Sequence, residues 1–335
     1  MQTPASLAAA TADAAAHFPS PAASEPADPV GLLGETAEPL DFEAELAAGT
    51  DERYYDADLY DLEYGRRRHD IDWYRKLARD VAEAAAGREE PLRIVDLGCG
   101  SGRLLVPLLR DGHWVCGIDR SAPMLRACQK RLSSVNARAR TRVHILQSDF
   151  RALPLAGPFR LILCPFNAFM HLYTRDDVER FLAEVRRLLQ PDGIFALDVF
   201  HPDPVWLARN PLRRFARTRI RHPRSGERLI QSTSHVYDPA TQMAWIRFYY
   251  EPDPQTGPPT RAFEPGREVA GRTTGDATAD GVTRVVRLAQ RLYFPAELEA
   301  LLHYNGFAIT YRAGGFDGSP LCPVSSEQVI CARMR

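Results

Sequence analysis

The chain has 335 residues, of which 45% are hydrophobic, and its 42 basic and 43 acidic side chains leave a net charge of -1. This length suits one large α/β domain with an insertion or two modest domains, and the hydrophobic content suffices for a core. The near-zero charge disfavours a general nucleic-acid-binding protein, and no apolar run reaches the roughly 18 residues that a membrane span needs.

The first 48 residues differ in composition from the rest. They are dominated by Ala, Pro, Ser, Thr, Glu and Asp, and no basic residue precedes Arg53. This predicts a disordered tail over 1–48 and argues against a secretory signal or a transit peptide. A tyrosine-rich stretch follows over 53–64, and apolar periodicity then predicts a helix over about 71–86.

A glycine-rich turn is the strongest feature of the sequence and lies within residues 93–109. The first five of these residues are typical of a short buried strand, and the last seven have the apolar spacing of a helix. Gly98, Gly100 and Gly102 therefore fall on a strand-to-helix turn, where glycine lets the backbone approach a ligand and helix N–H groups can bind it. A dinucleotide fingerprint needs glycine in place of Arg103, so a nicotinamide-dependent dehydrogenase is disfavoured.

Strands and helices alternate after this turn. Buried strands are predicted over 114–119, 143–146, 159–164 and 194–200, and an amphipathic helix over 176–189 is followed by a turn at 191–193. The carboxyl ends of parallel strands border the ligand crevice of an open α/β sheet, so residues at these ends are candidate site residues. They are Asp119 at the end of the second strand, and Asn167 and His171 after the fourth as the best candidates on the substrate side. Asn167 and His171 are four residues apart and would share a helical face.

The pattern acid-x-Gly-x-Gly-x-Gly from Asp96 to Gly102, with Asp119 and Asp149 at the next two strand ends, resembles class I S-adenosylmethionine-dependent methyltransferases. The tyrosine-rich stretch resembles the sugar and amine N-methyltransferases within that class. The resemblance covers 53–200 and 291–335. It implies an α/β fold with a Rossmann-like, doubly wound seven-stranded sheet whose last strand is antiparallel.

The resemblance also implies S-adenosyl-L-methionine as cofactor and S-adenosyl-L-homocysteine as product. The implied cofactor-binding residues are Asp96, Gly98, Cys99, Gly100, Gly102, Asp119, Arg120, Met124, Asp149, Phe150, Pro165 and Phe166. On the acceptor side it implies His171, Asn167 and Tyr64 as catalytic candidates. Structural roles stay open for several of these: packing for Tyr64 and Met124, loop capping for Asp149, and a structural instead of a catalytic role for His171. For Tyr54 and Cys99 we expect packing.

Residues 203–290 break the alternation of strand and helix. Strands with alternating hydrophobicity are predicted over 228–237, 243–250 and 282–293, which indicates a small antiparallel β lid with a flexible loop over 251–281. Seven arginines between Arg209 and Arg224 form a basic cluster, which suits a solvated face better than an anionic substrate or RNA. The predicted domains are therefore a core over 49–202, the lid, and the C-terminal part of the core over 291–335.

These features predict an enzyme that transfers a methyl group to an N or O atom of a small-molecule acceptor by in-line displacement. His171 would remove the proton of a hydroxyl acceptor, whereas an amine needs no base. Two alternatives stay open: an RNA or protein methyltransferase that uses the Arg209–Arg224 cluster, and a non-catalytic cofactor-binding scaffold. We expect no nucleic-acid partner, no membrane partner and a homodimer formed through the lid. The six cysteines form no C-x-x-C pair, which favours a reducing cytoplasmic location without a metal site.

Overall fold

The computed structural model describes residues 42–84, 91–254 and 283–335. Most of the expected tail and most of the expected loop over 251–281 lie outside these residues. The tail prediction was wrong at its end, because helix α1 (Phe42–Asp51) begins inside it. Among the described helices, none is long and apolar enough to cross a lipid bilayer.

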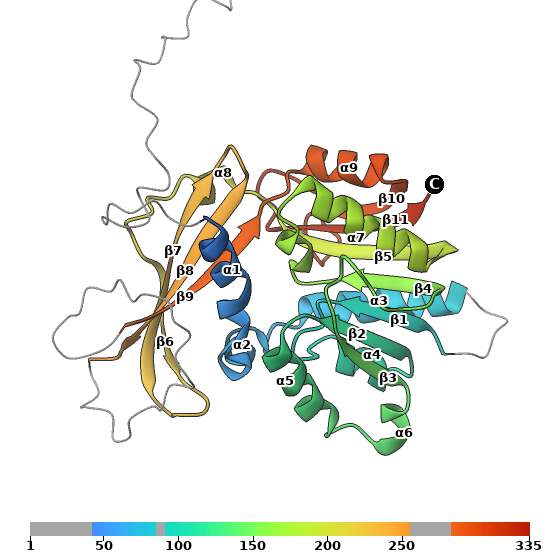
Figure 1. The fold of residues 1–335 in the computed structure, drawn as a ribbon, viewed down its shortest axis with the longest axis horizontal. Helices are drawn as coiled ribbons and strands as arrows, with labels where there is room; N and C mark the ends of the chain where they lie inside the picture. Colours follow the sequence, from blue (N-terminus) through green and yellow to red (C-terminus); the bar gives the residue numbers. More distant parts are fainter. Residues whose placement is uncertain (1–41, 85–90, 255–282) are drawn as a thin grey trace, which may run out of the picture. The chain divides into compact units, whose positions relative to one another are not determined.

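A seven-stranded sheet with the order β10-β11-β5-β4-β1-β2-β3 forms the larger part of the fold (Figure 1). Its strands are β1 (Arg93–Leu97), β2 (Trp114–Asp119), β3 (Val143–Gln147), β4 (Phe159–Cys164), β5 (Leu189–Phe200), β10 (Phe307–Ala313) and β11 (Glu327–Met334). The first five are parallel, whereas β11 runs antiparallel to both of its neighbours, β5 and β10. This is the predicted doubly wound sheet with an antiparallel last strand.

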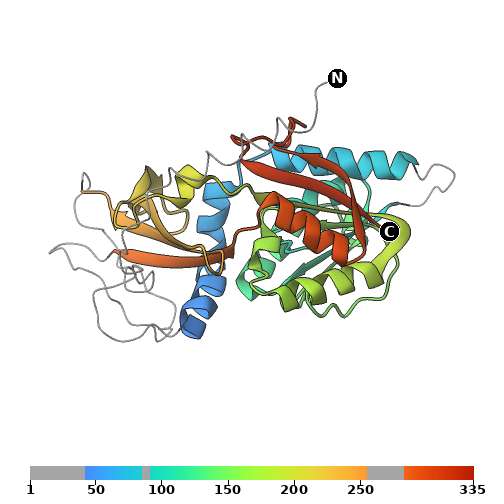
Figure 2. The same cartoon turned by 90° about the horizontal axis from the view of Figure 1, so that it is seen from above.

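Helices cover both faces of this sheet, as Figures 1 and 2 show. One face packs on α3 (His69–Ala84), α4 (Leu105–Arg110), α5 (Ala122–Leu132) and α6 (Ala137–Arg140), the other on α7 (Arg175–Leu188) and α9 (Pro295–Tyr304). Successive β1 residues alternate between the two cores: Ile94 belongs to the first, and Val95 and Leu97 to the second. A strand that is buried on both faces reads as a continuous apolar run, which is why the sequence pattern identified it.

One predicted boundary in the core was wrong. The turn expected at 191–193 lies inside β5, which begins at Leu189 rather than Ile194. Leu189 pairs with Phe159, and the register of β4 and β5 then shifts before Ile194 pairs with Leu161. The irregular pairing accommodates the Pro-Asp-Gly sequence without ending the strand.

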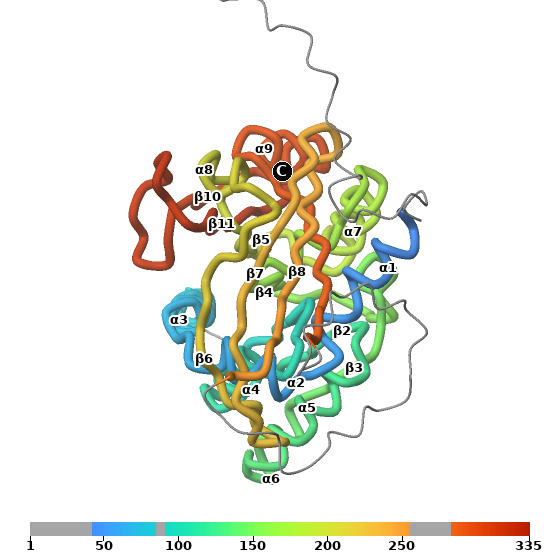
Figure 3. The backbone as a smooth tube through the Cα atoms, turned by 90° about the vertical axis from the view of Figure 1, so that its left-hand side faces the viewer, coloured from blue at the N-terminus to red at the C-terminus, as the bar shows by residue number. Residues whose placement is uncertain are grey.

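A second sheet has four antiparallel strands in the order β6-β7-β8-β9 (Figure 3). They are β6 (Phe215–Arg221), β7 (Arg228–Asp238), β8 (Met243–Pro252) and β9 (Arg284–Arg291), and the short helix α8 (Pro204–Leu207) precedes them. The sequence predicted the last three strands but not β6. Five of the seven β6 side chains are exposed, so this strand lacks the apolar alternation on which strand prediction depends.

The segment over residues 42–64, here called the arm, packs against this second sheet. It consists of α1, a short 3-10 helix η3 (Glu52–Tyr54) and α2 (Ala57–Tyr64). Leu59 of α2 belongs to a hydrophobic cluster with side chains of β7, β8 and β9, and the Phe42 ring meets the Trp245 ring edge-on at 5.3 Å. The arm therefore shares a small core with the lid.

Candidate active site

The glycine turn after β1 has the backbone conformation that its sequence predicted. Gly98, Gly100 and Gly102 all have positive φ angles, of 77°, 53° and 80°. The turn is also sterically tight, because a Cβ at Gly98 would lie 2.7 Å from the Cβ of Ala168. Side chains other than hydrogen would both strain this backbone and close the space beside it.

Asp119 at the end of β2 is held by the backbone around it. Its Oδ2 accepts the N–H of Gly100 at 2.8 Å, and its Oδ1 accepts the N–H of Ser121 at 2.8 Å. Burial raises the pKa of this carboxyl, although both N–H donors oppose the rise. The geometry places a desolvated carboxylate directly beside the glycine turn.

A pocket with an empty volume of about 800 Å³ opens at the carboxyl ends of β1, β2 and β4. This is the position at which sheet order reverses, where open α/β sheets bind ligands. Ten predicted site residues line it: Gly98, Gly100, Asp119, Arg120, Met124, Asp149, Phe150, Pro165, Phe166 and His171. Its remaining lining residues, which the sequence did not single out as site residues, are Thr50, Asp51, Tyr54, Tyr60, Ser121, Ser148, Arg151 and Ala168.

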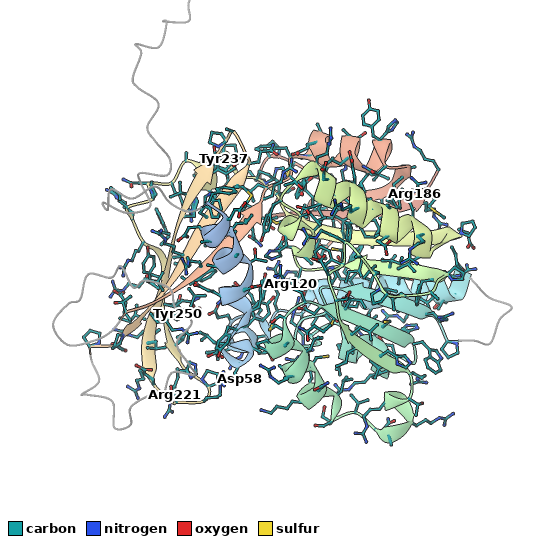
Figure 4. All side chains as sticks on the ribbon, viewed as in Figure 1. Asp58, Arg120, Arg186, Arg221, Tyr237 and Tyr250 are labelled. Atoms are coloured by element: carbon teal, nitrogen blue, oxygen red, sulfur yellow. The ribbon has the colours of Figure 1, made fainter. Side chains whose placement is uncertain are left out.

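Two arginines link acidic residues of the pocket wall to other elements. Arg151 donates to both carboxylate oxygens of Asp149, and this pairing outweighs burial and lowers the Asp149 pKa. Arg120, labelled in Figure 4, pairs with Asp51 of α1 at 3.2 Å. The second pair joins the arm to the residue that follows β2, and both of its side chains line the pocket.

Five predicted site residues do not line the pocket. Cys99 and Gly102 are buried behind the turn, where a Cβ at Gly102 would lie 2.7 Å from the Cys128 sulfur. The Tyr64 ring packs edge-on against the Phe166 ring at 5.2 Å, which is the packing arrangement left open for it. The other two, Asp96 and Asn167, have more informative surroundings.

Asp96 is fully buried at the end of β1, and neither carboxylate oxygen has a hydrogen-bond partner among the described residues. Burial and the nearby Asp119 raise its pKa to about 7, against the opposing charge of Arg103. Burying a carboxyl without a hydrogen-bond partner costs free energy, which makes Asp96 beside the glycine turn a candidate for a functional role.

Asn167 and His171 do not share a helical face as predicted. Asn167 has a left-handed backbone with φ 64° and precedes a 3-10 helix, η4 (Ala168–His171), instead of lying within an α-helix. Its side-chain oxygen accepts the N–H of Phe200 at 2.6 Å. Only His171 reaches the pocket.

His171 is held between two tyrosines. Its Nε2 lies 2.6 Å from the Tyr54 hydroxyl, and its Nδ1 lies 3.0 Å from the Tyr173 hydroxyl. The Tyr173 hydroxyl is in turn 2.8 Å from the Thr50 hydroxyl. Burial and the charge of Arg120 lower the His171 pKa to about 4, so the imidazole is neutral at pH 7.

The arm contributes four pocket residues that the sequence did not single out, namely Thr50, Asp51, Tyr54 and Tyr60. We had expected Tyr54 to pack, yet its hydroxyl binds His171 inside the pocket. The tyrosine-rich composition of residues 53–64 was the feature of the sequence that could have indicated the two tyrosines. The two phenol groups and the Thr50 hydroxyl give this part of the pocket an apolar lining with a few hydroxyls, as ligand pockets often have.

The Arg209–Arg224 cluster is partly neutralised by acidic neighbours. Arg214 pairs with Glu251 at 2.6 Å, and Arg219 pairs with Asp253 at 3.2 Å. Arg224 pairs with Asp56 at 2.9 Å.

In the part of the chain that the structure describes, no group of three or more His, Cys, Asp or Glu side chains is arranged to hold a metal ion.

Known proteins are similar to the part of the chain that provides most of the pocket lining. Residues 94–193 match the methyltransferase domain family. The chain is 34% identical over 115 residues to the putative methyltransferase YqeM of Bacillus subtilis. It is 26% identical over 193 residues to dTDP-4-amino-2,3,4,6-tetradeoxy-D-glucose N,N-dimethyltransferase of Saccharopolyspora spinosa, a match that covers 57% of this chain and 71% of that protein.

The match to YqeM covers 34% of this chain and 44% of the relative, so the chain spans less than half the length of that protein. Among solved structures, the CcbJ methyltransferase of Streptomyces caelestis is similar with a TM-score of 0.61 at 21% identity, covering 85% of this chain and 98% of that chain. Residues 94–193 thus match a methyltransferase domain, and the chain has the fold of the methyltransferases among these solved structures.

Proposed function

We propose that the protein is an S-adenosylmethionine-dependent N-methyltransferase for a small-molecule acceptor that carries an amino group. The observation that carries this proposal is the pocket in which two left-handed glycines and the backbone-held Asp119 come together. The relative from Saccharopolyspora spinosa acts, by its name, on an amino sugar nucleotide. That similarity supports an amine as the acceptor.

The residues present fit a cationic sulfonium nucleoside. Asp96 and Asp119 place two buried carboxyls at the glycine turn, and Asp96 has no hydrogen-bond partner among the described residues. A dinucleotide fingerprint needs glycine in place of Arg103, so this turn does not suit a diphosphate. Gly98, Gly100, Asp119, Met124 and Phe150 would hold the cofactor, as the resemblance implies for them.

The bound cofactor supplies a methyl group on a sulfonium, which is already a good leaving group, so the chain's main task is positioning. Holding reactants in line can supply about 7–11 kcal/mol of the barrier. His171 and Tyr54 stand at the pocket wall as one hydrogen-bonded pair. Because the His171 pKa is about 4, the imidazole is a weak base. An amine that arrives unprotonated needs no base to attack, so this site favours an amine over a hydroxyl.

Calorimetry with S-adenosylmethionine and S-adenosylhomocysteine tests the proposal. We expect both to bind the wild-type protein, and we expect Asp119→Ala to abolish binding because the buried acceptor beside Gly100 is lost. The exposed Asp176→Ala is the matched control and should bind normally. The absence of heat with wild type, or undiminished affinity in Asp119→Ala, would remove the assignment.

The alternatives have weaker support. The paired arginines of the 209–224 cluster leave less free charge for RNA, and a nucleic-acid acceptor would make turnover fall steeply with added salt. A cofactor-binding scaffold would yield no methylated product from a broad panel of amines. No observation on the described residues favours either one.

Assembly and location are further proposals. β6 is the outer strand of the four-stranded sheet and pairs only with β7 within the described residues, so its free edge could join a second copy into a homodimer. A light-scattering mass equal to one chain would refute this. The six cysteines, all in the described part of the chain, are free, which supports the cytoplasm as the compartment.

A further inference from the structure

Two consecutive residues after β4 have left-handed backbones. The φ angles of Phe166 and Asn167 are 55° and 64°. Asparagine tolerates this conformation, but for a bulky residue such as phenylalanine it is an outlier that the surrounding structure must enforce. The strained turn lies at the pocket, because Pro165, Phe166 and Ala168 line it and the helix that follows ends at His171.

The end of β5 enforces this conformation through three hydrogen bonds. The Phe166 N–H donates to Oδ1 of Asp198 at 2.8 Å, and the Asn167 N–H donates to the Asp198 carbonyl oxygen at 3.3 Å. In the opposite direction, the Phe200 N–H donates to the Asn167 side-chain oxygen at 2.6 Å. Both left-handed residues are thus tied to the neighbouring strand.

Asp198 is itself held in place from α3. The hydroxyl of Tyr74, a fully buried residue, donates to the same Oδ1 at 2.6 Å. Asp198 is only 2% exposed and lies between the buried Leu197 and Val199 of β5. An apolar side chain would be the less costly occupant of such a position, so the carboxylate is best explained by the two donors that it accepts.

The turn also fixes the Phe166 ring against charged and aromatic neighbours. The Arg103 guanidinium lies 4.4 Å from the centre of this ring and the Arg67 guanidinium 5.4 Å. Tyr64 and Tyr60 of the arm approach the ring edge-on at 5.2 and 6.4 Å. A change in the backbone at Phe166 would therefore move a contact between the arm and the pocket wall.

We propose that Asp198, oriented by Tyr74, is a positioning residue that holds Phe166 and Asn167 in the left-handed conformation and thereby sets the pocket wall and His171. The inference rests on the proposed function, because the pocket wall matters only if the pocket binds the cofactor. Asp198 acts through the turn and does not itself line the pocket.

The test compares Asp198→Ala, Asp198→Asn and Val199→Ala. Asp198→Ala removes the acceptor of Phe166 and Tyr74, so we expect the turn to relax and S-adenosylmethionine to bind at least about tenfold more weakly, which corresponds to about 1.4 kcal/mol of binding free energy. Asp198→Asn keeps an Oδ1 that can accept both donors and should stay within about threefold of wild type. Val199→Ala loses buried atoms of the same strand but keeps the turn, so it should bind normally despite lower stability.

Wild-type affinity in Asp198→Ala, or an equal loss in Val199→Ala, would overturn the inference. A wild-type protein that binds no S-adenosylmethionine would instead refute the proposed function, and the φ angles of Phe166 in an Asp198→Ala crystal structure would still test the turn. If Asp198→Ala does not fold, Asn167→Gly and Asn167→Val supply the same test. Glycine adopts the left-handed conformation freely and valine resists it, so binding should be weaker in the valine variant. Equal binding in the two would contradict the inference.

Discussion

At the scale of single residues, the burial of the Asp96 carboxyl lowers the stability of the folded protein. Asp96 is fully buried, its two oxygens have no hydrogen-bond partner among the described residues, and its pKa is raised to about 7. Such a group binds its proton more tightly in the folded state than in the unfolded chain. The stability that this proton contributes is complete below pH 4 and is lost as the pH rises toward 7.

We therefore expect Asp96→Asn to stabilise the cofactor-free protein at pH 8, by up to about 4 kcal/mol for a shift from 3.8 to about 7. At pH 5 the gain should be much smaller, because the buried carboxyl is then protonated. Denaturant unfolding at the two pH values measures the difference. The exposed Asp176→Asn is the control and should show no such pH dependence. A stability difference that is equal at both pH values would contradict the raised pKa.

His171 gives a second prediction at this scale. Because its pKa is about 4, the ring is uncharged from pH 6 to pH 9 and cannot produce an ionisation in the pH profile of kcat. His171→Gln should lower kcat, since the partner of the Tyr54 hydroxyl is altered, while the shape of the profile stays that of wild type. Steady-state rates over this range provide the measurement. An inflection near pH 6–7 that disappears in the variant would show that His171 titrates there.

At the scale of elements, sequence patterns predicted those parts that are defined locally. The glycine turn, β1 and α7 were recognisable because their apolar spacing and turn residues determine them within a dozen positions. β6 was missed because its partners, and not its own side chains, make it a strand. The contact between Tyr54 and His171 joins residues 117 positions apart, which no local pattern can indicate. The same holds for Asp198, whose link to the Phe166 turn depends on the pairing of β4 with β5.

The glycine turn provides the prediction for this scale. Gly98→Ala would place a methyl group 2.7 Å from the Ala168 Cβ at a φ of 77°. Left-handed strain and overpacking together should cost about 2–5 kcal/mol and weaken cofactor binding. Gly112→Ala is the matched control: its φ is 102°, but nothing lies within 4 Å of the added methyl. It should lose stability through strain alone, about 1–3 kcal/mol, and keep its affinity. Thermal unfolding and calorimetry of both variants decide the matter, and equal affinities would show that the space beside Gly98 is not used.

At the scale of the whole described molecule, the arm connects the two sheets. It reaches the lid through Arg287, which pairs with Glu45 at 2.8 Å and also with Glu52, and through Asp56, which pairs with Arg224. It reaches the core where the Ser101 hydroxyl donates to Asp61 at 2.6 Å. Because the arm also carries Thr50, Tyr54 and Tyr60 into the pocket, the lid and the cofactor site are joined through it.

One link between the arm and the lid is buried. Arg53 is 3% exposed, forms an ion pair with Glu63, and donates to the hydroxyl of Tyr250, which is labelled in Figure 4, at 2.9 Å. Its guanidinium also lies 4.1 Å from the centre of the Phe248 ring of β8. Arg53→Met leaves the Glu63 carboxylate buried without its cation, and removal of one partner from a buried pair costs about 3–5 kcal/mol.

The double variant Arg53→Met/Glu63→Gln separates the charge from the packing. It leaves no buried charge, so it should regain most of the stability that Arg53→Met loses, as measured by a four-protein denaturation cycle. Lys76→Met removes the exposed pair with Asp80 and should cost less than about 1 kcal/mol.

The same link makes a prediction about cofactor affinity. Tyr54, which lines the pocket, is next to Arg53 in η3, so loss of the Arg53 contacts should disturb the pocket. Arg53→Met should therefore weaken cofactor binding, whereas Lys76→Met should not. If Arg53→Met loses stability but binds S-adenosylmethionine as wild type does, then the lid and the pocket are independent, and the arm is an anchor for the second sheet alone.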